Sequence, residues 1–198
     1  MHNRQALHWR HYNYAQNGAY FITITTQNRA RLFGQIINGT IHLNLAGKMI
    51  ADVWNNLHIY YPTIITDAFI VMPDHFHGII IIDNSYQSSN NQGQAQRPVP
   101  TNQTNLSTEP VRMGLRAHPC PNESHPHPFS LFDCIRNFKS LTTHRYIDGV
   151  NQNYLAPFHK RLWQQRYYET IIKSYRHLKN VRTYITNNPL NYTTRHNK

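Results

Sequence analysis

Two histidines lie two residues apart in the segment His75-Phe76-His77. The apolar run that follows predicts a strand over residues 75–82. Residues two apart on a strand project from the same face, so both imidazoles point one way while Phe76 points into the core. Imidazole is a common ligand of divalent metals, and the pair therefore suggests an open metal site. Two partly buried histidines with ordinary hydrogen bonds are the alternative that this motif alone leaves open.

A second pair, Tyr184 and Asn188, lies four residues apart near the C-terminus. The surrounding pattern predicts a helix over residues 175–187, capped by Ser174 and stopped by Pro189, so the two side chains share a face. A tyrosine hydroxyl can attack phosphorus and leave a phosphotyrosine, and an amide oxygen is a hard metal ligand. Because the chain has 13 tyrosines, a core tyrosine is the competing interpretation.

Cations and aromatic residues alternate on the segments before that helix. This mixture suits single-stranded nucleic acid, whose phosphates pair with cations while its bases stack on rings. Strand alternation places one of Tyr167 and Tyr168 in the core and the other in solvent. The predicted DNA contacts are Arg136, Lys139, Arg166, Tyr167 and Lys173.

The charge of the chain indicates the same kind of partner. The 198 residues include 20 Lys and Arg against 9 Asp and Glu, a net charge of +11. From residue 129 onward there are 12 Lys and Arg against 3 Asp and Glu, a net of +9. So few carboxylates among so many cations predict a phosphate-binding surface with salt-dependent affinity.

Other features of composition exclude several classes of protein. No apolar run approaches the length of a membrane span, and the N-terminal residues lack the apolar region of a secretory signal. Two cysteines, Cys120 and Cys134, are too few for a disulfide framework or a cysteine-based zinc site. We therefore expect a cytoplasmic protein with no membrane partner.

The elements that must position these residues alternate along the chain. Side-chain patterns predict strands at 19–27, 68–72, 75–82 and 162–172, and helices at 44–57, 130–147 and 175–187. The order β-α-β-β-α-β with one further helix predicts an α+β fold, a ferredoxin-like antiparallel sheet with a C-terminal helix. We expect a single domain with a core of about 15–192, and a flexible, Asn-, Ser- and Pro-rich insertion at 84–128.

Five phrases together resemble the single-tyrosine transposases of insertion sequences, and in particular the branch of REP-associated tyrosine transposases. His75-Phe76-His77 is similar to their HUH motif of two histidines around a bulky hydrophobe. The resemblance covers nearly the whole chain apart from the insertion and the tails. The phrases are GAYFITITTQNR (18–29), VMPDHFHGII (71–80), FKSLTT (138–143), WQQRYYE (163–169) and YITNNP (184–189).

The resemblance implies that the chain cuts and rejoins single-stranded DNA next to an imperfect hairpin. It assigns Tyr184 as the nucleophile of a 5′-phosphotyrosine intermediate. It assigns His75, His77 and Asn188 as ligands of Mg²⁺ or Mn²⁺. It leaves open whether a monomer or a homodimer acts.

Two positions depart from the family pattern. Thr170 stands where relatives often carry His, and Tyr192 stands where they usually carry Trp. Neither is a nucleophile or a metal ligand in the implied assignment, so we expect activity to be retained.

Two other functions are compatible with parts of the sequence. A catalytically silent DNA hairpin-binding protein would keep the fold and the basic surface, but all four catalytic positions hold usable residue types. A metal-dependent hydrolase of small phosphoesters would explain the histidines, but this function does not explain the net charge of +9 in the C-terminal third.

Overall fold

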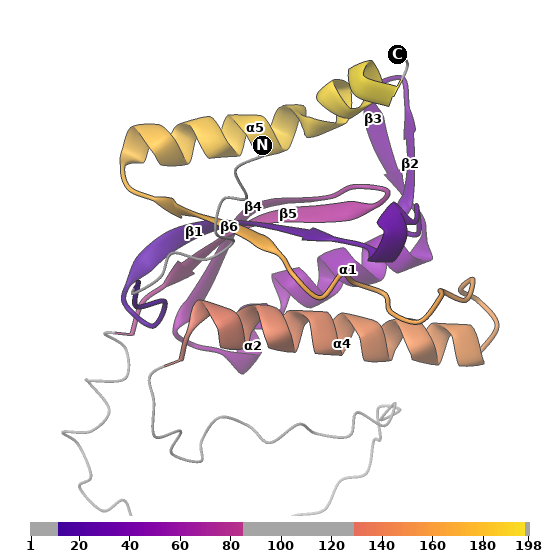
Figure 1. Cartoon of the computed structure of the whole chain (residues 1–198), viewed down its shortest axis with the longest axis horizontal. Helices are drawn as coiled ribbons and strands as arrows, with labels where there is room; N and C mark the ends of the chain where they lie inside the picture. Colours follow the sequence, from indigo (N-terminus) through magenta and orange to yellow (C-terminus); the bar gives the residue numbers. More distant parts are fainter. Residues whose placement is uncertain (1–11, 85–128, 197–198) are drawn as a thin grey trace, which may run out of the picture.

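The computed structural model describes residues 12–84 and 129–196. The insertion predicted at 84–128 therefore lies outside the described residues, apart from Asn84. Figure 1 shows the elements in chain order, which are β1 (Gly18–Thr25), the 3-10 helix η1 (Gln27–Arg29), β2 (Gly34–Ile37), β3 (Thr40–Leu43), α1 (Leu45–Asn55), α2 (Leu57–Tyr60), β4 (Ile64–Val71), β5 (His75–Ile82), α4 (Leu131–Asn151), β6 (Tyr168–Ile172) and α5 (Tyr175–His196).

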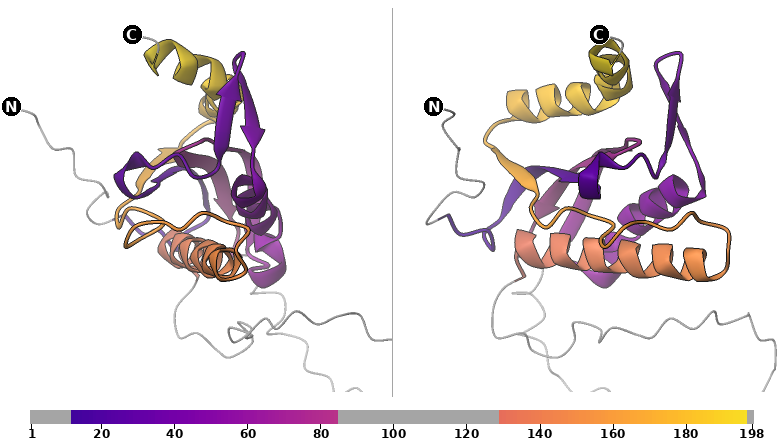
Figure 2. Two further views of the ribbon diagram at one scale, coloured as in Figure 1. Left: turned by 90° about the vertical axis from the view of Figure 1, so that its right-hand side faces the viewer. Right: turned by 45° about the vertical axis from the view of Figure 1, so that its right-hand side comes forward.

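Four strands form one antiparallel sheet in the order β4-β5-β1-β6. This is the strand order of a β-α-β-β-α-β fold, so the predicted ferredoxin-like α+β architecture is confirmed. Helices α1, α2 and α4 lie on one side of the sheet and α5 lies on the other (Figures 1 and 2). The sheet is therefore the middle of three layers, and β2 and β3 form a separate hairpin.

The two faces of the sheet carry different cores. Alternate residues of β1 and β5, such as Ile22, Ile24 and Phe76, are fully buried in the main core on the side of α1 and α4. The opposite face meets α5 through a small apolar cluster around Ile79 and Ile185. Because strand side chains alternate between faces, the histidines beside Phe76 face α5.

Capping residues set the starts of the long helices. Ser130 accepts a hydrogen bond from the backbone N–H of Asp133, whose side chain bonds back to Ser130, which forms a capping box at the start of α4. Ser174 accepts from the N–H of His177 at the start of α5, as predicted. Within the described ranges, no helix combines the length and the apolarity that crossing a bilayer requires.

Helix α5 corrects one expectation, because it continues through Pro189 instead of stopping there. Proline removes one helical hydrogen bond, which tertiary contacts beyond it can offset. The tip of the β2–β3 hairpin supplies such a contact, since a Cβ on Gly39 would lie 2.5 Å from Cδ2 of Leu190. Asn38 and Gly39 turn the hairpin with φ values of 49° and 74°. This hairpin was not among the predicted elements.

The strand predicted at 162–172 is also shorter than expected. Only Tyr168–Ile172 forms β6, while Trp163 makes an isolated bridge to Thr26. The backbone N–H of Gln164 donates to the carbonyl of Thr25. Tyr168 pairs with Thr23 on β1. The segment from Trp163 to Tyr168 is longer than the facing segment from Thr23 to Thr26, so its extra residues loop out of the ladder.

Candidate functional site

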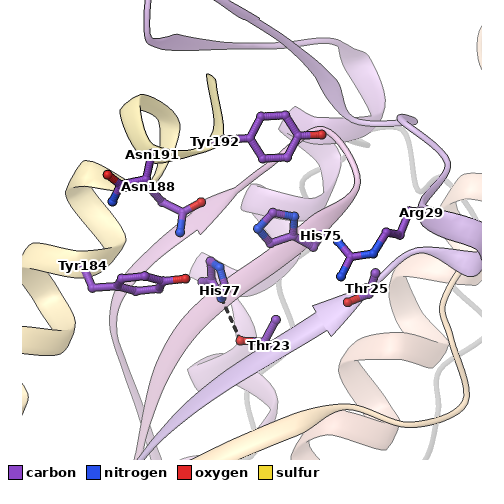
Figure 3. Close-up of a pocket in the computed structure, with 9 residues that line it drawn as sticks. All are labelled: Thr23, Thr25, Arg29, His75, His77, Tyr184, Asn188, Asn191 and Tyr192. Atoms are coloured by element: carbon purple, nitrogen blue, oxygen red, sulfur yellow. Dashed lines mark hydrogen bonds between the residues drawn. The ribbon is translucent and has the colours of Figure 1, made fainter. Parts of the chain in front are cut away.

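A cavity of about 180 Å³ lies between the sheet and α5 (Figure 3). Strands β1 and β5 form its floor, and the C-terminal half of α5 forms one wall. It contains the histidine pair and the Tyr184–Asn188 pair together, although more than a hundred residues separate them in the sequence. The lining residues are Thr23, Thr25, Arg29, His75, His77, Tyr184, Asn188, Asn191 and Tyr192.

The register of β1 and β5 builds the floor. His75 lies opposite Thr25, and His77 lies opposite Thr23. Directly paired residues share a face of an antiparallel sheet, so both imidazoles and both hydroxyls point toward α5. The two imidazole centroids are 4.7 Å apart, and both residues are buried.

Each imidazole is oriented through its Nδ1 atom. Nδ1 of His75 is 2.6 Å from Oδ1 of Asp74, and Nδ1 of His77 is 2.8 Å from Oγ1 of Thr23. Both hydrogen bonds leave the Nε2 atom for another partner. A carboxylate or hydroxyl on the far nitrogen is the usual support of a metal-binding histidine.

The local electrostatics keep His77 neutral. Burial, followed by the charge of His75, lowers the pKa of His77 to about 3. Burial raises the pKa of Asp74, but the hydrogen bond from His75 and the charges of His75 and Arg29 outweigh it and hold that pKa below its ordinary value. The neutral imidazole is the form that can bind a metal.

Helix α5 brings Tyr184 and Asn188 to the floor from above. The Tyr184 ring stands edge-on to His77, with centroids 5.4 Å apart, and also contacts Phe21 at 5.8 Å. Tyr184 is 39% exposed, so a ligand can reach its hydroxyl. Asn188 lies one turn further along and is only 6% exposed, yet within the described residues its amide has no hydrogen-bond partner.

These donors fit a divalent cation of the predicted kind. The described parts of the chain contain no group of three His, Cys, Asp or Glu residues that could hold a metal, so an ion here needs the Asn188 oxygen beside the two imidazoles. The two Nε2 atoms and the amide oxygen of the buried Asn188 could serve together as an open set of three ligands. Imidazole favours Mn²⁺ over Mg²⁺ within such a set.

Arg29 is a lining residue that the sequence analysis did not single out. Its guanidinium lies 3.5 Å from the Asp74 carboxylate, and its side chain is 69% exposed. Asn28 and Arg29 have φ values of 56° and 53°, a conformation that costs energy for residues other than glycine. The turn after β1 thus places a cation at the rim of the cavity.

The predicted DNA contacts on α4 lie away from the cavity. Helix α4 lies on the side of the sheet opposite α5 (Figure 1). Arg136 on this helix is exposed and pairs with Asp133. Lys139 donates from Nζ to the backbone oxygens of Gln164 and Gln165, at 2.6 and 3.0 Å. Burial and the charge of Arg161 lower the pKa of Lys139. Lys139 therefore supports the backbone before β6, which was not expected.

The structure also separates the two adjacent tyrosines. Tyr167 is 8% exposed and belongs to the main core, whereas Tyr168 is 61% exposed. The expected alternation is present, and Tyr167 is the buried member, so little of its ring is accessible to a DNA base. Arg166 and Lys173 are exposed at the two ends of β6.

Comparison with known proteins defines the class of fold. The structure of a REP-associated tyrosine transposase bound to a REP hairpin aligns with 93% of this chain and 73% of its own, with a TM-score of 0.53 and 17% sequence identity. This likeness confirms the predicted fold.

The relationship in sequence is closer to another protein. Over 190 residues the chain is 30% identical to an uncharacterized protein of Haemophilus influenzae, which covers 96% of this chain and 90% of that protein. The chain belongs to the same family as this Haemophilus influenzae protein. No protein-family model matches the chain.

Proposed function

We propose that the chain is a transposase that cleaves and rejoins single-stranded DNA at hairpin sequences, with Tyr184 as the nucleophile. One observation carries the proposal. A partly exposed phenol, two imidazoles with free Nε2 atoms and a buried amide line one cavity. The hairpin bound to the REP-associated transposase and the net charge of +11 of this chain support DNA as the substrate.

The proposed reaction transfers a phosphoryl group to the protein. The Tyr184 hydroxyl loses its proton and its oxygen attacks the scissile phosphorus in line with the leaving O3′ atom. An O–P bond forms, the P–O3′ bond breaks, and O3′ takes up a proton. The products are a 5′-phosphotyrosine on the chain and a free 3′-hydroxyl. Another 3′-hydroxyl can reverse the step without ATP, because one phosphodiester has replaced another.

Other residues in and next to the cavity support this step. His75, His77 and Asn188 would hold Mg²⁺ or Mn²⁺, which when bound withdraws charge from the phosphate oxygens. Asp74 and Thr23 orient the two imidazoles through Nδ1. Arg29 at the rim offers a cation to the DNA backbone.

The proposal is tested by trapping the covalent adduct. A hairpin-bearing single-stranded oligonucleotide from the DNA flanking the gene, labelled on the 3′ side of the cut, is incubated with the protein and Mn²⁺. We expect a protein–DNA band that resists denaturation, disappears with EDTA and is lost in Tyr184→Phe. Tyr175→Phe is the matched control, because Tyr175 lies on the same helix, outside the cavity and 77% exposed.

Persistence of the adduct in Tyr184→Phe would overturn the assignment of the nucleophile. The alternative function, a silent hairpin-binding protein, gives a different result. Such a protein would bind the oligonucleotide equally with and without Mn²⁺ and would give no adduct in the unsubstituted chain.

A further inference from the structure

We infer that Tyr168 is a stacking platform for a DNA base, and that it positions the nucleotide next to the phosphate in the cavity. The inference rests on the proposed function, because it assumes single-stranded DNA at this site. It assigns a contact to a residue outside the cavity lining.

Strand register places Tyr168 beside the site. Tyr168 pairs with Thr23, and Thr23 pairs with His77, so the three residues form one row across β6, β1 and β5. Paired residues share a face, and this is the face that carries the cavity. Adjacent strands lie about 4.8 Å apart, which puts the backbones of Tyr168 and His77 about 10 Å from each other. A short stretch of single strand can span that separation.

The Tyr168 ring is open to a ligand. The residue is 61% exposed, and within the described residues its ring packs against no other aromatic ring. Strand β6 is an edge of the sheet, so no further strand flanks the ring on its outer side. A large aromatic surface next to a proposed phosphoryl-transfer site suits a base, since every base has a face that can stack.

The backbone that carries the Tyr168 ring is held by contacts with the main core and with α4. The side chain of Tyr167, the preceding residue, is inserted in the main core. Lys139 fixes the carbonyls of Gln164 and Gln165, where the chain loops out of the ladder before β6. A platform that is ordered before binding costs little conformational entropy when a base stacks on it.

The surrounding charges also favour a nucleic acid strand. Arg166 and Lys173 are exposed at the two ends of β6. The acid on this strand, Glu169, alternates to the other face, where its carboxylate accepts a hydrogen bond from the Tyr14 hydroxyl. The acid of β6 therefore lies on the face opposite the Tyr168 ring.

The experiment measures binding without cleavage. Oligonucleotides from the DNA flanking the gene carry 2-aminopurine at successive positions around the cut, and titrations are made in EDTA. Stacking on tyrosine quenches 2-aminopurine, so we expect one position to be quenched by the unsubstituted chain and by Tyr168→Phe but not by Tyr168→Ala. Tyr168→Ala should weaken binding about fivefold or more. Tyr154→Ala, at an exposed tyrosine beyond α4, should leave both unchanged.

An abasic nucleotide provides the second arm. Placed at the quenched position, it should weaken binding to the unsubstituted chain but cause no further loss with Tyr168→Ala, because the two changes remove one contact. Equal loss in both proteins, or quenching that survives in Tyr168→Ala, would overturn the inference. Failure of the proposed function is separate. A chain that forms no adduct but shows Tyr168-dependent quenching would lose the proposed function and keep the platform.

Discussion

At the scale of single residues, the hydrogen-bond partners of the two histidines decide which imidazole nitrogen is left to bind a ligand. A histidine pair on a strand is a common arrangement, but here each Nδ1 atom has a dedicated partner. Asp74 is 2% exposed and forms the shorter of the two hydrogen bonds, with His75. A buried carboxylate on the far nitrogen fixes the imidazole and increases its basicity toward a metal.

The role of Asp74 gives a prediction for metal affinity. Asp74→Asn keeps the size of the side chain but removes its negative charge, so we expect Mn²⁺ to bind about tenfold more weakly or worse. Isothermal titration calorimetry in the absence of DNA measures this directly. Asp52→Asn, which changes an exposed acid paired with Arg145 between α1 and α4, is the matched control. Unchanged affinity in Asp74→Asn would contradict the proposed ligand geometry.

At the scale of elements, the attachment of α5 to the sheet determines where Tyr184 lies. Few apolar residues make this contact, chiefly Ile79, Val181 and Ile185. An ion pair adds to it, because the guanidinium of Arg182 makes two hydrogen bonds to the carboxylate of Asp67 on β4. The layer that carries the proposed nucleophile, Tyr184, is therefore held by a smaller core than the rest of the fold.

This ion pair predicts a pH dependence of stability. Burial raises the pKa of Asp67, but hydrogen bonds from Arg182 and from the N–H of Ala68 outweigh it, so the net pKa is below the ordinary value of 3.8. A lowered folded-state pKa stabilises the fold above the ordinary value, and this stabilisation is lost as the pH falls through the lowered pKa. Asp67→Asn should reduce the loss of stability in acid, as measured by urea unfolding from about pH 6 down to about pH 2. An identical acid profile in the variant would show that Asp67 contributes nothing.

At the scale of the whole molecule, a single chain assembles the complete cavity. The Tyr184 ring lies 5.4 Å from His77 of the same chain, and α5 runs over the sheet of its own domain (Figure 1). No residue from a second copy is needed to bring the phenol, the imidazoles and the amide together. The geometry thus supports a proposed attack by Tyr184 within one chain, a question that the sequence left open.

This arrangement predicts that two defective chains cannot rescue each other. Tyr184→Phe keeps the histidines, and His77→Ala keeps the tyrosine. If each chain builds its own site, an equimolar mixture should form no more adduct than the two variants alone. The measurement is the adduct assay with labelled oligonucleotide. Recovery of adduct clearly above the level of the two separate variants would instead indicate that α5 is exchanged between chains.

Local patterns were sufficient for much of the fold. Alternation over β1 and β5, the Ser130 and Ser174 caps and the order of elements led to the ferredoxin-like sheet with its added helix. They failed where a distant contact outweighs a local preference. Pro189 remains helical while the hairpin tip supports Leu190. The hairpin itself was missed for another reason, because Asn38-Gly39 between two apolar runs is a strong local signal of a two-residue hairpin turn that was overlooked.

Local sequence is enough to predict which side chains share a strand or helix face, because that property depends on neighbours two to four residues away. It paired His75 with His77, and Tyr184 with Asn188. Three features depend on tertiary contacts: the two pairs meet in one cavity, Lys139 supports a loop, and Tyr168 rather than Tyr167 is exposed. Strand order and helix packing bring together residues that are far apart in the chain, and no local periodicity encodes that distance.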